Sequence, residues 1–532
     1  MRKSSYLFIG LIVLLALVNA CNPKVATDVP ASTETQTVET IVPIEETASK
    51  PAEPVVLKYA SNATPLASLD RFSSKGVSGD DTGRLWADAL LVSDHRGTYS
   101  PSLAESWSAS DDGLEFTFVL KQGIKFSNGD DFTSVDVKKT FERLLEDEKL
   151  TDASTWTSSL DHVETPDEYT AIVVLKALMP TFYDEVDRVP IINAKVYDLD
   201  PANYFFAPVG TGAFVVSNFN RDTGEIHFMR NDNYWGWTPE SRSNVDQIVY
   251  QFIKEDTTRA SALEAGDVDI ATQLTMDYLT TFSSEKFNPN PLALDRHYAI
   301  YFSCGETSVF KDKNLREAMS LSIDRQALVD TIYSGGGVVS TFPVPVGNLG
   351  YVGGYSYEYN PERAKDIINA STYKGEEISL MLTTASLPRA TEIAAAIQAM
   401  AVEAGFNLKI DMVESATYET NRTSGTYQIY LGAFNPTASD FYKEVAVNLL
   451  KDKFKSNCIG EEMKTLSAEA AVTVDREARA TLYEQIFTSE MGEFAPGAYL
   501  YTAKFLYPMK NSISNVTFYT DGTVVLKYAH KN

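Results

Sequence analysis

The sequence predicts an α/β protein whose strands and helices alternate along one long folded region. From residue 55 onward, short apolar runs with strand periodicity are followed repeatedly by amphipathic helical segments. Of the 532 residues, 44% are hydrophobic and 22% are charged, which is the balance of a folded chain rather than a disordered one. At roughly 100–200 residues per domain, this length corresponds to two to four domains or lobes.

The first residues predict export from the cytoplasm. Arg2 and Lys3 precede an apolar run from Tyr6 to Val18, and small or polar residues close the segment before Cys21. A basic head, a short apolar stretch and a small residue before the cleavage point are typical of a secretory signal peptide. The run is too short to span a hydrocarbon core of ~30 Å comfortably. We expect residues 1–20 to be removed, which takes the net charge from −26 to −28.

The segment Leu17-Val18-Asn19-Ala20-Cys21 resembles the lipobox of bacterial lipoproteins. The resemblance implies that the Cys21 thiol is acylated and that this residue becomes the new N-terminus. An ordinary signal peptide and a short anchor helix are the alternatives. Residues 22–54 contain five prolines and no aromatic residue, so they bury too little apolar surface to fold. We therefore expect residues 21–54 to be a lipidated cysteine followed by a flexible tether.

The elements that follow are predicted from periodicity and turn signals. Val55–Ala60 is a strand, and residues 82–92 have helical spacing. Residues 115–120 alternate with period two after the turn Asp111-Asp112-Gly113, which predicts a second strand. Thr133 to Asp136 resembles a capping box and predicts a helix start.

Strand–helix–strand alternation continues in the second half. Asn360-Pro361-Glu362 supplies an N-cap, a proline at the first helical position and an acid in the first turn. We predict a helix at 388–404, ended by Gly405, and strands at 377–383, 406–413 and 427–433. This alternation predicts an α/β lobe with crossover connections.

Composition and motifs exclude several functions. The chain has 46 Lys+Arg against 72 Asp+Glu and lacks the basic cluster that a nucleic-acid binder needs. None of the five histidines lies at metal-ligand spacing to another, and neither a Walker A loop nor a G-x-S-x-G elbow is present. Two S-x-x-K matches, at 283–286 and 308–311, show how readily that pattern arises by chance. We predict a binding protein that has no catalytic residue, no resident metal and no cofactor.

A series of motifs in a fixed order points to one family. The first block contains Tyr99–Trp107, the D-D-G-L-E-F-T-F run that ends at Phe118, Leu120–Phe126, Ser127–Asp130 and Thr133–Val137. Further blocks are Pro208–Phe214, Arg230–Gly236, Leu263–Asp269, Phe310–Met319 and Ser322–Arg325. Together they resemble the family-5 extracellular solute-binding proteins of bacterial ABC importers, the group that contains the oligopeptide- and dipeptide-binding proteins.

The resemblance implies a two-lobed α/β fold of the periplasmic-binding-protein (Venus flytrap) type. Mixed sheets, a hinge between the lobes and a small extra domain inserted in lobe I belong to this expectation. The expected boundaries are 55–92, 208–292 and 509–532 for lobe I, 93–207 for the inserted domain and 293–508 for lobe II.

The resemblance also implies a role. A monomer tethered by lipid to the extracytoplasmic face of the cell membrane, in the periplasm or at the cell surface, would capture peptides in an interlobe cleft and deliver them to an ABC permease. The first alternative is the same role for an oligosaccharide or a metal chelate. The second is a surface hydrolase or adhesin lipoprotein on an unrelated fold.

In peptide-binding members, an aspartate of a W-x-x-D segment pairs with the α-amine of the peptide. The corresponding segment here runs from Tyr430 to Asp440, and ungapped placement puts Leu431 at the tryptophan and Phe434 at the aspartate. Asp440 is the candidate replacement. The candidate ligand-binding residues that the resemblance implies are Trp156, Phe434, Asn435, Asp440, Tyr499 and Tyr501.

Two cysteines remain besides Cys21. Cys304 ends an apolar stretch, and Cys458 lies in the polar run Lys455-Ser-Asn-Cys. A disulfide between them is one alternative for a protein outside the cytosol, but spacing along the chain does not supply the geometry that a disulfide needs. Two unpaired thiols is the favoured prediction.

Overall fold

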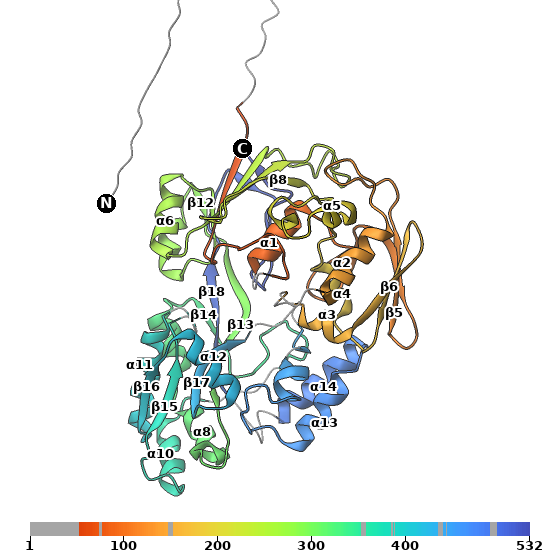
Figure 1. Cartoon of the computed structure of the whole chain (residues 1–532). Helices are drawn as coiled ribbons and strands as arrows, with labels where there is room; N and C mark the ends of the chain where they lie inside the picture. The colour runs from red at the N-terminus through yellow and green to blue at the C-terminus, as the bar shows by residue number, and fades with distance from the viewer. Residues whose placement is uncertain are drawn as a thin grey trace, which may run out of the picture. The chain divides into compact units, whose positions relative to one another are not determined.

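Three larger sheets organise the part of the chain that the structure describes (Figure 1). The computed structural model describes residues 53–73, 77–146, 150, 153–352, 358–384, 387, 389–434, 440–442, 444–489 and 497–532. Pro54–Asn532 is one compact unit. The predicted signal peptide, Cys21 and nearly all of the tether lie outside the described residues.

The seven-stranded sheet combines stretches of chain that are far apart in sequence, in the order β12-β19-β11-β1-β10-β9-β8. Its strands are β1 (Val56–Ser61), β8 (Phe214–Phe219), β9 (Ile226–Arg230), β10 (Gln247–Phe252), β11 (Ile270–Ala271), β12 (Phe287–Asn288) and β19 (Met509–Lys510). The central β1 runs parallel to both β10 and β11. It is buried on both faces, because Leu57 and Tyr59 belong to one core cluster and Ala60 belongs to another.

The four-stranded sheet is antiparallel and has its own core. It consists of β4 (Ala104–Ala109), β5 (Glu115–Leu120), β7 (Thr170–Leu175) and β6 (Leu160–Asp167), in that order. Helix α2 (Ser134–Glu146) packs against it through Val137, Phe141 and Leu144. The helix begins as predicted, since the Asp136 carboxylate accepts a hydrogen bond from the backbone N–H of Thr133 at 2.9 Å.

The six-stranded sheet is mixed, with the order β14-β18-β13-β17-β15-β16. Its strands are β13 (Pro291–Phe302), β14 (Gly337–Val339), β15 (Ile378–Leu382), β16 (Leu408–Met412), β17 (Ile429–Phe434) and β18 (Gly497–Leu506). β13 pairs antiparallel with β17 and β18, whereas β15 runs parallel to β16 and β17. Helix α10 (Pro361–Ala370) begins where predicted, and α11 (Ala390–Ala404) lies close to its predicted limits and ends at Gly405 with φ +111°.

The chain crosses between the seven- and six-stranded sheets at two neighbouring places. β13 follows β12, and β18 is followed by β19 after two residues. The two crossings lie side by side, since Pro291 pairs with Leu506 and Leu274 bridges to Leu506. Figure 1 shows the long strands β13 and β18 running from one sheet region to the other.

The remaining elements surround these sheets. The helices are α1 (Val77–Trp86), α3 (Ser154–Ser159), α4 (Phe182–Asp187), α5 (Ala194–Leu199), α6 (Asp256–Ala265), α7 (Leu279–Phe282), α8 (Lys313–Leu321), α9 (Arg325–Ala327), α12 (Ser415–Ser424), α13 (Glu461–Ala470) and α14 (Arg476–Ser489). Shorter turns are η1 (Tyr204–Phe206), η2 (Met276–Tyr278), η3 (Val309–Lys311), η4 (Leu328–Ile332) and η5 (Glu444–Leu449). Two-stranded pairs join β2 (Leu91–Ser93) to β3 (Tyr99–Pro101), β20 (Ile513–Ser514) to β23 (His530–Lys531), and β21 (Thr517–Phe518) to β22 (Val524–Val525).

The helix predicted at 82–92 is wrong in its second half, because α1 ends at Trp86 and β2 follows. A distant loop replaces the helical hydrogen bonds there. The carbonyl of Trp86 accepts from the N–H of Gly212, and the N–H of Asp88 donates to the Thr211 hydroxyl. A Cβ at Gly212 would lie 2.4 Å from the Leu85 carbonyl oxygen, so this approach requires glycine.

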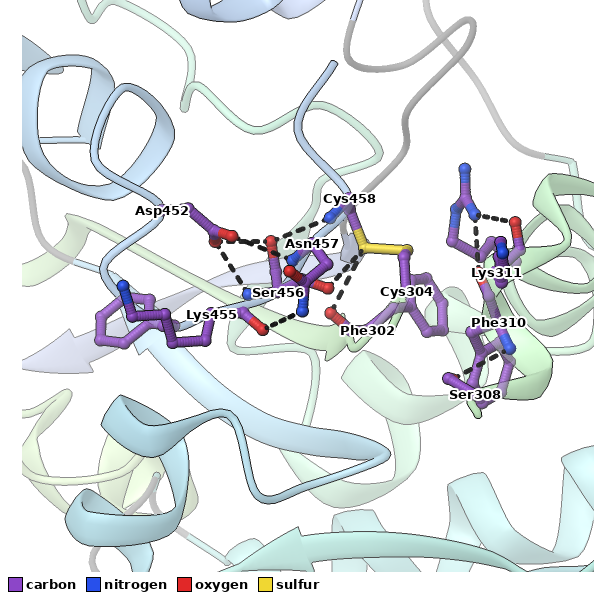
Figure 2. The surroundings of a disulfide bond; sticks show 12 residues. Phe302, Cys304, Ser308, Phe310, Lys311, Asp452, Lys455, Ser456, Asn457 and Cys458 are labelled. Atoms are coloured by element: carbon purple, nitrogen blue, oxygen red, sulfur yellow. Dashed lines mark hydrogen bonds between the residues drawn. A yellow bond between two sulfur atoms is a disulfide. The ribbon is translucent and has the colours of Figure 1, made fainter. Parts of the chain in front are cut away.

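Cys304 and Cys458 form a disulfide, which corrects the prediction of two unpaired thiols (Figure 2). Cys304 follows β13, and its N–H donates to the carbonyl of Ser456 at 2.6 Å. The Asp452 carboxylate shapes the loop before Cys458, because it accepts from the backbone N–H groups of Ser456 and Asn457. These contacts bring together two cysteines that are 154 residues apart in the chain.

The expected lobe boundaries at 92/93, 207/208, 292/293 and 508/509 stay predictions. Among the helices in the described ranges, none is long and apolar enough to cross a membrane.

Candidate functional site

The structure places Trp156 inside the core of the four-stranded sheet region. Its side chain is 0% exposed, and its ring packs edge-on against Phe141 and Phe182 at centroid distances of 5.0 and 6.0 Å. In this arrangement the indole stabilises the core, and it does not line the β14 cavity described below. A ligand-binding role for Trp156 stays a prediction.

Tyr501 lies on β18, between β14 and β13 of the six-stranded sheet, in a cluster of tyrosines. Its hydroxyl donates to the Tyr333 hydroxyl at 3.0 Å, and its ring lies 5.2 Å from that of Tyr298. Burial raises the pKa of Tyr501 well above its usual range, so this group stays protonated and acts only as a hydrogen-bonding group.

Phe434 and Tyr499, which are 65 positions apart, are brought together by the pairing of β13 with β17 and β18. Both rings pack against His297, at centroid distances of 5.7 and 5.3 Å, and Phe441 stacks on the same imidazole at 5.9 Å. Burial lowers the pKa of His297 to about 3, so the imidazole is neutral at physiological pH. His297, Phe434, Phe441 and Tyr499 thus form an aromatic cluster that carries no charge at physiological pH.

Asp440 is buried and its carboxylate is already paired. It accepts from Arg479 at 2.8 Å and from the Tyr483 hydroxyl at 2.9 Å, and Arg476 lies 3.7 Å away. The N–H of Tyr442 donates to the same carboxylate at 2.9 Å. A ligand ammonium would have to displace one of these partners, which costs free energy. The ligand-binding role of Asp440 stays a prediction.

Asn435, the sixth candidate for ligand binding, lies outside the described residues, as does the proposed lipidation site Cys21.

Sequence reasoning missed the hairpin loop between β2 and β3, which contacts the six-stranded part of the molecule. Arg96 donates hydrogen bonds to the carbonyl of Gly347 and to the Thr520 hydroxyl. A Cβ at the neighbouring Gly97 would lie only 2.7 Å from Nε of Arg476 in α14. The signal available in the sequence was a run of charged residues in a turn between two short strands.

A second acid faces the Asp440 pair across this contact. Asp184 of α4 accepts from the hydroxyls of Ser93 and Tyr99 at 2.9 and 3.1 Å. Burial, together with the nearby charge of Asp440, raises the pKa of Asp184 to about 6. The carboxylate of Asp184 in α4 therefore interacts electrostatically with Asp440 and with Arg476 of α14.

A cavity of about 230 Å³, here called the β14 cavity, lies beside the crossing strands. Its lining combines the six-stranded sheet with two loops of the other part of the molecule: Arg96, Ala293, Leu294, Asp295, Val338, Val339, Ser340, Thr341, Phe342, Pro345, Val346, Tyr351, Val352, Thr502 and Thr520. Most of these side chains are apolar, and Arg96 is the cation among them. Asp295 is already satisfied by Asn348 at 2.9 Å and Thr520 at 2.6 Å.

β14 is an edge strand beside this cavity. Among the described strands its single neighbour is β18. Gly336 and Ser340 use their backbone groups on the β18 side, through Lys504 and Leu500 respectively. Because the backbone direction alternates in an antiparallel ladder, the N–H and C=O of Val339 face away from β18.

A second cavity, of about 150 Å³, is lined by charged groups that neutralise one another. The ion pairs are Arg71–Asp80, Arg188–Asp80, Arg84–Asp187 and Lys527–Asp88. Nearby, His95 lies 3.5 Å from Asp187 and 3.3 Å from Asp521. Burial lowers the pKa of His95, but these two carboxylates outweigh it and raise the pKa to about 9. These ion pairs link α1 to α4, and Asp88 just after α1 to the C-terminal segment, and they stabilise this packing.

Across the described ranges, no group of three or more His, Cys, Asp or Glu side chains is arranged to hold a metal ion.

Comparison with known proteins identifies the fold. The family model "Bacterial extracellular solute-binding proteins, family 5 Middle" matches residues 98–453, which is more than half of the chain. The crystal structure of NikA from Brucella suis in complex with Fe(III)-EDTA superposes with a TM-score of 0.79 at 19% identity, covering 90% of this chain and 100% of that chain. The predicted α/β periplasmic-binding-protein fold with mixed sheets is confirmed.

Two curated relatives cover most of the chain. The probable D,D-dipeptide-binding periplasmic protein DdpA of Escherichia coli K12 is 28% identical over 431 residues, which span 78% of this chain and 81% of that protein. The oligopeptide-binding protein AppA of Bacillus subtilis 168 is 25% identical over 534 residues, which span 94% and 93%.

Proposed function

The chain belongs to the bacterial extracellular solute-binding proteins of family 5, and from this premise we propose that its cargo is a peptide held in the β14 cavity. Membership confirms the resemblance predicted from the motifs. It makes the chain an extracytoplasmic solute-binding protein of an ABC importer, and thus a binding protein rather than an enzyme.

The observation that carries the peptide proposal is the free edge of β14. An extended peptide adds to an exposed strand edge through main-chain hydrogen bonds, whatever its side chains are. Val339 offers an N–H and a C=O on that edge, and no described residue hydrogen-bonds to either group. Val338 and Val339 also line the β14 cavity, so a strand added there would place its side chains against the apolar residues of that lining.

The lining suits side chains and a carboxylate. Phe342, Leu294 and Val352 supply apolar surface, which favours burial of uncharged side chains. Arg96 uses two of its five N–H donors on Gly347 and Thr520. The other donors are available to a peptide carboxylate, which guanidinium groups bind well.

A second candidate, a non-peptide cargo such as a metal chelate or an oligosaccharide, is favoured by Asp440. Its carboxylate is saturated by Arg479 and Tyr483, so it does not serve a free amine in this arrangement. A ligand without an α-amine would need no such partner. The NikA structure cited above holds Fe(III)-EDTA, and its fold is shared here.

Membrane attachment at Cys21 completes the proposal. The basic head, apolar run and lipobox-like ending support acylation at this residue, and the proline-containing segment after it would act as a tether. A monomer held in this way at the extracytoplasmic face would deliver its cargo to the permease.

Mass spectrometry of the ligand released from denatured, freshly purified protein separates the two candidates. Recovered peptides support the first, whereas a recovered sugar or metal chelate supports the second. Val339→Pro then tests the edge directly in binding titrations with a recovered peptide. Proline removes the outward N–H and is tolerated at a sheet edge, so we expect a folded protein with at least tenfold weaker binding.

Val339→Ala is the matched control, since it shortens the side chain and keeps the N–H. Full peptide affinity in Val339→Pro would refute strand addition at β14.

A further inference from the structure

A buried carboxylate in η5 has fewer partners than its burial demands. Glu444 is 8% exposed, and its one hydrogen bond in the described part of the chain comes from the Asn448 amide to Oε2. Burying an ionised carboxylate without a cation partner is costly. Burial raises the pKa of Glu444 to about 7, even though Arg422 and Lys453 act in the opposite direction. Among the described residues, no cation forms an ion pair with this carboxylate.

Glu444 lines a small cavity whose walls contain several aromatic rings. The rings are those of Tyr301, Phe302, Tyr427, Tyr430, Phe454 and Tyr499, and Asn448, Leu449, Asp452, Ser456 and Ile459 complete the lining. Tyr430 is stacked on Tyr301 with centroids 4.9 Å apart, and Tyr427 meets Tyr430 edge-on at the same distance. Ring faces carry negative charge density and attract organic cations. The carboxylate and the rings thus both favour a positively charged group in the cavity.

Two cations already lie close to these rings. Arg422 lies 4.2 Å from the ring of Phe454 and 5.9 Å from that of Tyr430 and donates to Glu419 at 2.6 Å, and Lys453 lies 5.4 Å from the Phe454 ring. Neither forms an ion pair with Glu444. Asp452, the other acid in the lining, is committed to Ser456 and Asn457.

The size of the cavity limits what it can hold. Its volume is about 30 Å³, whereas a single water needs roughly 10–15 Å³ measured in this way. The space therefore admits a group about as large as water, such as an –NH₃⁺ head, but not a quaternary ammonium with three methyl groups. A bare metal ion is disfavoured because, within the described ranges, no three His, Cys, Asp or Glu side chains are arranged to hold one.

We propose that this cavity, the Glu444 cavity, binds a protonated primary amine, whose ammonium group pairs with Glu444 and faces the rings of Tyr301 and Tyr430. The site is distinct from the β14 cavity, since the two share no lining residue. It therefore does not depend on the nature of the main cargo.

Methylammonium chloride is the probe, added to the full folded chain and followed by ligand-observed saturation-transfer NMR at pH 8 and constant ionic strength. We expect saturable binding to the wild type and at least tenfold weaker binding to Glu444→Gln. Glu461→Gln is the matched control, because Glu461 is an exposed acid that pairs with Lys464 and is not among the residues that line the cavity. It should bind as the wild type does.

Competition on the wild type keeps the test independent of how the variants fold. Ethylammonium, a primary amine, should displace methylammonium, whereas tetramethylammonium and potassium at equal concentration should not. Undiminished binding by a folded Glu444→Gln, equal displacement by potassium or tetramethylammonium, or absence of saturable binding would each overturn the proposal.

Discussion

Removing the disulfide should lower stability by an amount that the chain length sets. Cys304 and Cys458 are separated by 154 residues, and the double change Cys304→Ala/Cys458→Ala frees that whole loop in the unfolded state. The chain-entropy relation gives about 5 kcal/mol for a loop of this length at 25 °C. With a urea m-value of ~2–3 kcal/mol/M, the midpoint of unfolding should fall by about 2 M.

The distribution of tryptophan sharpens the assay. All five tryptophans lie between positions 86 and 237, before β13 begins, so the disulfide-containing region contains none. Far-UV circular dichroism reports the unfolding of the whole chain. Tryptophan fluorescence reports only the region before β13, which contains all the tryptophans. We expect the dichroism midpoint to fall by the full amount. The fluorescence midpoint falls equally only if the two regions unfold as one cooperative unit.

Reduction provides the control. Dithiothreitol should reproduce the shift in the wild type and should have no effect on the double variant. A dichroism midpoint that moves by less than about 0.4 M, which corresponds to about 1 kcal/mol, would refute the loop-entropy reasoning.

Four further predictions concern the paired charges, the contact loop and the anchor. Asp440→Asn leaves the buried Arg479 without its counter-ion and should lower the free energy of unfolding by about 3–5 kcal/mol in urea titrations. His95→Gln should flatten the pH dependence of stability. The raised pKa makes His95 stabilise the fold fully below pH ~6.5, and about 3 kcal/mol of this is lost as pH rises through 9. Gly97→Ala, at φ +94° and against Arg476, should weaken cargo binding several-fold in calorimetry. Cys21→Ser should move the protein from the membrane to the soluble fraction of cells.

Each of these has an outcome that contradicts it. Normal stability with at least tenfold weaker binding of a peptide cargo would make Asp440 a ligand residue instead. A pH profile of His95→Gln that matches the wild type between pH 6.5 and 9 would show that the imidazole has no raised pKa. Gly97→Ala with wild-type affinity would separate the β2–β3 loop from cargo binding, and palmitate labelling that persists in Cys21→Ser would place the lipid elsewhere.

Local sequence patterns predicted the secondary structure correctly where residues close together in sequence decide it. The strand at 115–120 alternates buried and exposed residues as predicted, and α11 ends at Gly405 because glycine adopts a positive φ freely. The start of α2 followed from its own capping residues. The prediction failed after Trp86, where a loop more than 120 residues away supplies the backbone partners.

The candidate site was predictable only in part, for the same reason. Phe434 and Tyr499 do share a neighbourhood, because both lie on strands that pair with β13. Trp156 is instead enclosed by its own core, and burial of a single aromatic ring depends on what the fold packs around it. Arg96 and Glu444 were missed, since an exposed loop charge and a buried unpaired acid look alike in sequence.

The sequence by itself determined much of the order of strands and helices and the membership of the solute-binding family, because both depend on short contiguous patterns. Only the tertiary structure decided the pairing of Cys304 with Cys458, the neutralisation of Asp440 by Arg479, and the positions of the β14 and Glu444 cavities. These depend on which distant groups meet, and contacts between residues tens to hundreds of positions apart are set by packing of the whole chain rather than by any local preference.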